Sequence, residues 1–122
     1  MSQPPQWLAT ARMLRRTGFG TTGAQVDAVV KQDWSGYLDW ALSLDPNADP
    51  GAVATPMPKS AIPQYPAAGA SATEIAAFGQ ELVARMQELS GWWLRRMAAV
   101  QQPIHEKLTL LWHNHFATSA EK

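Results

Sequence analysis

The sequence of 122 residues contains no cysteine. This absence excludes a disulfide framework, a thiolate zinc site and a cysteine nucleophile. An excess of charge is absent as well, because ten basic and ten acidic side chains give a formal net charge of zero. Basic side chains gather towards both ends of the chain and acidic ones in its middle. The whole-chain charge therefore gives no general attraction to nucleic acid or to anionic lipid.

Long hydrophobic runs are also absent. No segment approaches the roughly 18 uninterrupted apolar residues that a membrane-spanning helix requires. The polar, proline-rich start of the chain has no charged segment leading into an apolar core, so it does not match a secretory signal. Without an export signal, the default expectation is a cytoplasmic protein that does not span a membrane.

Helical patterns dominate what the sequence does contain, and we predict a mainly α fold with about five helices. Capping residues, and proline in the first turn, mark where these helices begin. The expected starts are Pro5, Thr22, Asp33 or Ser35, Ser71 and Pro103. The first helix is expected to end at Thr17, with a left-handed C-cap at Gly18. The fourth helix is expected to break or kink near residues 90–91, where Gly91 weakens it.

Composition divides the chain into three segments. Residues 1–44 form an N-terminal helical segment, residues 45–70 form a loop rich in proline, alanine and glycine, and residues 71–122 form a long helix and a final helix. The long helix carries a continuous apolar stripe from Ile75 to Val100, at steps of three and four residues. The final helix is apolar on several sides, which is typical of a helix buried on several sides. We therefore expect residues 71–122 to be an incomplete part of a larger domain.

His113 and His115, separated by one residue, are the candidate metal ligands. Imidazole commonly binds transition metals such as zinc, so a divalent transition metal is the one cofactor that the sequence suggests. In a regular helix the two side chains point about 200° apart and cannot reach one ion, whereas in an unwound helix end they can. The alternative is structural, with His115 facing the core and His113 on the opposite side, one turn beyond Thr109.

Arginines form the other conspicuous groups. Arg95 and Arg96 follow two tryptophans, a combination that can stack on bases and bind phosphates. The alternative for these two arginines is ion pairing with Glu88 or with a later part of the chain. Gly18 and Gly20 follow the first helix, and so do not match a dinucleotide-binding loop, which follows a strand and opens a helix.

Three segments, taken in order, resemble the N-terminal region of a large bacterial family catalogued as domain of unknown function 1800. They are residues 12–20, 93–97 and 106–119, and the last, which includes Trp-His-Asn-His-Phe, is the most specific. Members of that family are several times longer and mainly helical, so the resemblance implies a truncated or fragmentary member that holds the opening section. It implies no activity and no catalytic residue, but it does place His113 and His115 in the family's signature.

The sequence supports three functional hypotheses. The first is a non-catalytic helical segment of a larger uncharacterised bacterial protein, with the remainder of that protein or another protein as its partner. The second is an enzyme in which His113 or His115 supplies a metal ligand or an acid–base group. The third is polyanion binding through arginines, although there is too little basic surface to favour nucleic acid. The arginines concerned are Arg12, Arg15, Arg16, Arg95 and Arg96.

Overall fold

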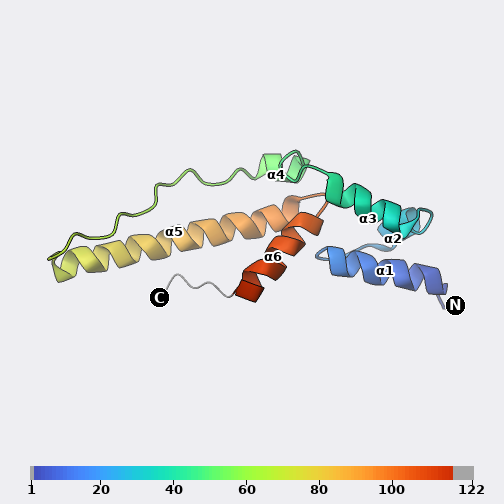
Figure 1. Cartoon of the computed structure of the whole chain (residues 1–122), viewed down its shortest axis with the longest axis horizontal. Coiled ribbons are helices and arrows are strands. Elements are labelled where there is room, and N and C mark those ends of the chain that lie inside the picture. Colours follow the sequence, from blue (N-terminus) through green and yellow to red (C-terminus); the bar gives the residue numbers. More distant parts are fainter. Residues whose placement is uncertain (1, 117–122) are drawn as a thin grey trace.

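A computed structural model describes residues 2–116, with only the backbone described at Trp34. The predicted mainly α fold is confirmed, and this part of the chain contains no strand. It contains six helices, one more than expected: α1 (Pro5–Thr17), α2 (Gly23–Val29), α3 (Trp34–Ser43), α4 (Pro50–Ala54), α5 (Ala72–Ala99) and α6 (Ile104–Phe116). Figure 1 shows an elongated molecule with α1, α2 and α3 at one end, and with α5 extending to the other end while α6 diverges from it.

The first three helices contain the main hydrophobic core. Its buried side chains come from α1 and α2, and they are Ala11, Leu14, Val26 and Val29. Trp7, Met13 and Tyr37 are partly buried against them. Trp7 also donates a hydrogen bond from Nε1 to Asp27 Oδ1 at 2.7 Å, which ties α1 to α2. The ring of Trp7 thus packs on the core while its polar atom has a partner.

Capping residues fix the starts of α2, α3 and α5, as the sequence predicted. Thr22 and Ser71 both form complete capping boxes, in which the side chain three residues later also bonds the cap residue's N–H. Asp33, rather than Ser35, caps α3. These side chains accept hydrogen bonds from N–H groups that have no partner inside the helix, so each helix begins at a defined residue.

The end of α1 packs against the start of α6. The predicted left-handed cap at Gly18 is wrong, because this residue has φ −142° and is extended. Gly18 is buried, and a Cβ there would lie 3.0 Å from Pro103 Cγ, so the glycine is explained by lack of space. Beside it, the Lys107 ammonium lies 5.2 Å from the centre of the Phe19 ring.

The segment 45–70, expected to be a loop, includes the short helix α4. Asp49 caps this helix and Pro50 occupies its first turn. Gly51 is buried against the end of α5, where a Cβ would lie only 2.0 Å from the carbonyl oxygen of Ala99. The absence of a side chain at Gly51 therefore allows the backbones of α4 and α5 to touch.

After α4 the chain runs back alongside α5 without regular structure (Figure 1), and we call residues 56–70 the strap. Two contacts join the strap to α5. Ser60 Oγ donates to Glu88 Oε2 at 2.6 Å, and the ring of Tyr65 meets that of Phe78 edge-on at 5.4 Å.

The long helix α5 is unbroken over 28 residues, so the break expected near residues 90–91 does not occur. A single glycine weakens a helix by only about 1 kcal/mol, which the neighbouring turns tolerate. The helix has no buried residue. Its predicted apolar stripe is therefore not a core face, since Ile75, Met86 and Leu89 are 56%, 41% and 46% exposed. Among the described residues, no helix is both long enough and apolar enough to cross a membrane.

Candidate functional site

The richest group of polar and aromatic side chains lies where α5 approaches α6. An open cleft of about 550 Å³ lies there. It is lined by Asn47, Met57, Trp92, Trp93, Arg96, Glu106, Thr109 and His113. These residues come from four parts of the chain, namely α5, α6, the segment before α4 and the segment after it.

Glu106 organises this cleft. Its carboxylate is buried and accepts hydrogen bonds at both oxygens, from Arg96 Nε to Oε1 at 2.6 Å and from Trp93 Nε1 to Oε2 at 3.0 Å. The side chains of Arg96 and Glu106 are only 12% and 10% exposed. This ion pair therefore links α5 to α6 in a place largely shielded from water, where an unpaired charge would be strongly unfavourable.

Arg96 and Trp92 extend the connection to the segments around α4. Arg96 donates a second hydrogen bond to the carbonyl oxygen of Pro46 at 3.2 Å, and its guanidinium lies 5.9 Å from the Trp92 ring centre. Trp92 Nε1 donates to the carbonyl oxygen of Thr55 at 2.8 Å. Within segment 92–96, three side chains therefore bind other parts of the same chain: Trp92, Trp93 and Arg96.

Both candidate metal ligands lie on the regular helix α6, and both are exposed. His113 meets the Trp93 ring edge-on at 5.4 Å, at the edge of the cleft and one turn beyond Thr109, as expected. The expectation that His115 faces the core is wrong. Its ring lies against Trp112 and Phe116, at 5.8 and 5.3 Å, because nothing in the described chain covers that side of α6.

A metal or acid–base role of His113 or His115, completed by residues outside this segment, stays a prediction, and the regular helix argues against one ion held by both. In a continuous helix their side chains point about 200° apart. Between residues 2 and 116, no three histidine, aspartate or glutamate side chains lie close enough together to hold a metal ion.

A second polar junction lies beside the cleft, at Asp49. Its carboxylate accepts backbone hydrogen bonds from Gly51 at 2.8 Å, and from Gln101 and Gln102 at 2.9 Å each. Partial burial raises the pKa of Asp49, but the donors at Gln102, Gln101 and Gly51 outweigh it and leave the pKa below its ordinary value. Asp49 thus caps α4 and also holds the turn between α5 and α6.

Comparison with known families follows the resemblance of the three sequence segments. A family model described as "Protein of unknown function (DUF1800)" matches residues 12–122, which include all three. The chain belongs to the DUF1800 family. No curated protein and no solved structure matches it.

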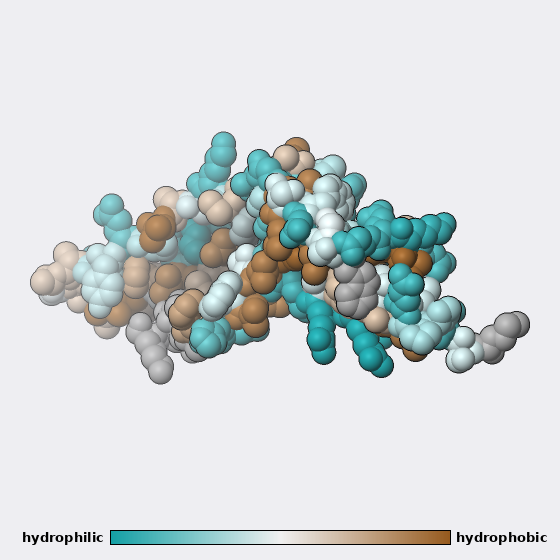
Figure 2. Space-filling view, turned by 45° about the vertical axis from the view of Figure 1, so that its right-hand side comes forward, coloured by the Kyte–Doolittle hydropathy of each residue, from teal (hydrophilic) through white to brown (hydrophobic). Residues whose placement is uncertain are grey.

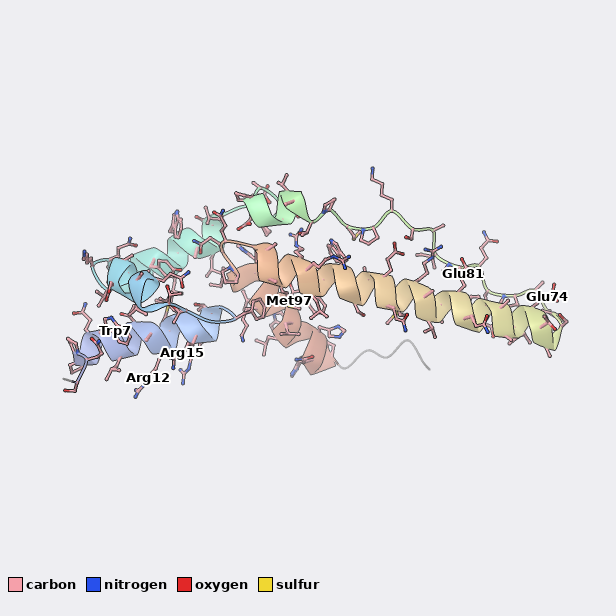
Figure 3. All side chains as sticks on the ribbon, turned by 180° about the vertical axis from the view of Figure 1, so that it is seen from behind. Trp7, Arg12, Arg15, Glu74, Glu81 and Met97 are labelled. Carbon is pink, nitrogen blue, oxygen red and sulfur yellow. The ribbon has the colours of Figure 1, made fainter. Side chains whose placement is uncertain are left out.

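In this DUF1800 chain the predicted arginine sites separate into two kinds. Arg96 is engaged by Glu106, the later part of the chain, whereas Glu88 pairs instead with Arg85 at 3.2 Å. Arg12 and Arg15 lie on the outer side of α1 and point away from the molecule (Figure 3). Arg16 and Arg95 are likewise exposed. The arginines therefore do not form one shared basic site with Arg96.

Two residues that join distant segments of the DUF1800 chain were not identified from the sequence. Glu106 was included only as the first residue of the family-like segment 106–119, and Asp49 lay within the expected loop. A signal for Asp49 was present, because aspartate before proline is typical of a helix start. Its contact with the turn some fifty residues later had no signal in the sequence.

Proposed function

We propose that this chain is a non-catalytic helical segment that contributes a packing surface to a larger DUF1800 protein. The observation that supports this proposal is the apolar surface of α5 and α6. The 28-residue helix α5 has no buried residue, and Leu111, Trp112 and Phe116 on α6 are 58%, 54% and 68% exposed. Brown, hydrophobic side chains are open to view on the face drawn in Figure 2.

Exposure on this scale has a physical consequence. Each large apolar side chain that passes from water into a protein interface contributes about 1.5–3 kcal/mol. Large exposed apolar patches usually mark interaction surfaces, whereas single exposed apolar residues are ordinary. Large apolar side chains are exposed on both helices, so their burial by further protein would stabilise both partners. On α5 they include Ile75, Met86 and Leu89, and on α6 they include Leu111, Trp112 and Phe116.

Self-association of the 122-residue chain tests this proposal, because an uncovered apolar surface should pair with a second copy when no other partner is supplied. We expect light scattering after size-exclusion chromatography to show oligomers, and calorimetry to show a broad melt. Leu89→Lys combined with Leu111→Lys should lower the association. The control variant is Val53→Lys combined with Ile62→Lys. These two side chains are apolar and 67% and 86% exposed, but they lie outside this surface, so the control should not lower the association. A sharp two-state melt of a monomer would contradict the proposal.

A second candidate is an acid–base or metal site at His113, completed by residues of the larger protein. The position of His113 favours it, since the imidazole is exposed at the edge of a cleft and lies against Trp93. Elemental analysis of a purified full-length family member, with and without His113→Ala and His115→Ala, tests this candidate. Stoichiometric zinc, iron or copper lost on substitution would support the metal form, and a metal content near zero in the unsubstituted protein would contradict it.

A further inference from the structure

A groove lies on the side of the molecule where α3 faces the turn between α5 and α6. Two adjoining clefts, of about 500 and 350 Å³, form it. Trp40, Gln101 and Gln102 line both clefts, so the two are parts of one groove with Trp40 between them. Trp40 is 47% exposed, which leaves part of its indole open to a ligand. Clefts of this size are typical of small-molecule sites.

The larger cleft is polar but carries no charged side chain. Its polar lining consists of Thr21, Tyr37 and four glutamines, Gln25, Gln32, Gln101 and Gln102. A glutamine amide has two N–H donors and a carbonyl acceptor. The acceptor of Gln25 is already used, since its Oε1 accepts the Thr22 N–H of the capping box at 2.8 Å. Burial raises the pKa of Tyr37, so its hydroxyl stays protonated at neutral pH and remains a donor. The cleft therefore offers both donors and acceptors without a net charge.

The turn that supplies two of these glutamines is held in place. The backbone N–H groups of Gln101 and Gln102 both donate to the Asp49 carboxylate. Their side-chain amides make no hydrogen bond within the described part of the chain, so they are available to a ligand in the groove. A fixed backbone with free amides lowers the entropic cost of binding.

These features select the class of ligand. The smaller cleft adds Asp45, Asp49 and His105 to the lining of the groove. Both carboxylates already accept backbone hydrogen bonds, from Asn47 and from Gln101 and Gln102. An anionic ligand would therefore meet like charge and no counter-charge, and a wholly apolar ligand would leave the glutamine amides unsatisfied.

A proline-rich peptide presents carbonyl acceptors but few N–H donors, and it docks on several aromatic rings. Here the Tyr37 ring is partly buried and lies 5.7 Å from the Trp40 ring at 49°, so Trp40 is the more exposed of the two rings. A sugar ring has hydroxyls that both donate and accept, and an apolar C–H face that can stack on an aromatic ring.

We propose that the groove around Trp40 binds a neutral oligosaccharide, with one sugar ring stacked on Trp40 and its neighbours hydrogen-bonded to the glutamines of the two clefts. This binding site is independent of the packing surface on α5 and α6. Trp40 is a binding residue in this proposal, and no reaction of the sugar is implied.

Isothermal titration of the chain tests the proposal with three neutral probes, cellopentaose, maltopentaose and chitopentaose. An acidic oligogalacturonate and a proline-rich decapeptide serve as competing classes of ligand. We expect at least one neutral probe to bind, and the acidic probe not to bind. Trp40→Ala should weaken that binding by about tenfold or more, while Trp40→Phe should retain part of it. Gln102→Ala should weaken it as well.

The matched control is Trp112→Ala, which removes an indole that is 54% exposed and lines neither cleft, and which should leave the dissociation constant unchanged. Circular dichroism of each variant checks that the helices are retained. The proposal is overturned if no neutral probe binds at millimolar concentration, if only the peptide binds, or if Trp112→Ala weakens binding as much as Trp40→Ala does.

Discussion

Removal of the Glu106 carboxylate should destabilise the chain strongly, because it leaves the largely buried guanidinium of Arg96 without its partner. Glu106→Leu keeps a side chain of similar size but deprives Arg96 Nε and Trp93 Nε1 of their acceptor, at 2.6 and 3.0 Å. Loss of one partner of a buried ion pair typically lowers the free energy of unfolding by about 3–5 kcal/mol. That is a large share of the about 5–15 kcal/mol that stabilises a small protein.

Urea denaturation followed by circular dichroism at helical wavelengths measures this loss. The matched control is Glu81→Leu, which breaks the exposed Arg85–Glu81 pair at 3.7 Å, where the side chains are 42% and 54% exposed. Exposed pairs contribute only about 0–1 kcal/mol, so this variant should unfold almost as the unsubstituted chain does.

A double variant separates the buried charge from the general effect of substitution. Arg96→Leu together with Glu106→Leu removes both charges and leaves no unpaired guanidinium. We expect it to be more stable than Glu106→Leu alone, with a coupling of about 0.5–3 kcal/mol between the two positions. Equal losses in Glu106→Leu and Glu81→Leu, or no coupling with Arg96, would refute the view that this pair joins α5 to α6.

Two further predictions concern α4. Gly51→Ala should lower the free energy of unfolding by about 1–3 kcal/mol or more, because its Cβ would collide with the Ala99 carbonyl oxygen. Gly79→Ala, which has open space around it, should instead raise the free energy of unfolding by up to about 1 kcal/mol. Urea titration of both variants checks these opposite signs. Asp49→Ala should remove about 1–2 kcal/mol at neutral pH. Because folding lowers the pKa of Asp49, its stabilisation is full at neutral pH and is lost as pH falls below about 4. Unfolding measured from pH 7 to 2 should therefore show a smaller loss on acidification in Asp49→Ala than in the unsubstituted chain.

Local signals in the sequence were sufficient for most helix starts. Thr22 and Ser71 each begin a capping box whose partner stands three residues later, so the whole signal lies within four residues. The bounds of α1 also follow from local features, namely a proline start and a stripe of apolar residues. Helix formation at these places depends little on the rest of the molecule.

Burial could not be predicted in the same way. The stripe from Ile75 to Val100 has the correct helical period, yet no residue of α5 is buried. Periodicity shows which side chains share a face, but the protein that covers the face is not encoded in the spacing. The error at His115 has the same origin, because its assignment to a core required a neighbour that the described chain does not supply.

The candidate site depends on contacts between distant segments, which explains why only part of it was predicted. Arg96 was given either Glu88 or a later residue as its partner, and sequence spacing could not choose between them. In the structure, the turn after α5 places Glu106 beside the end of that helix, within hydrogen-bonding distance of Arg96. The groove around Trp40 is built from α2, α3 and a turn some sixty residues later, so no local pattern marked it.

The strap has a consequence for how DUF1800 sequences can vary. Ser60 and Tyr65 contact α5 from the strap, whereas the connection between α4 and the end of α5 is made separately, through Asp49 and Gly51. A doubling in length of such a connection costs only about 0.6 kcal/mol in loop closure. Residues 56–70 are therefore the place where insertions and deletions can accumulate during evolution while both ends of the molecule keep their arrangement.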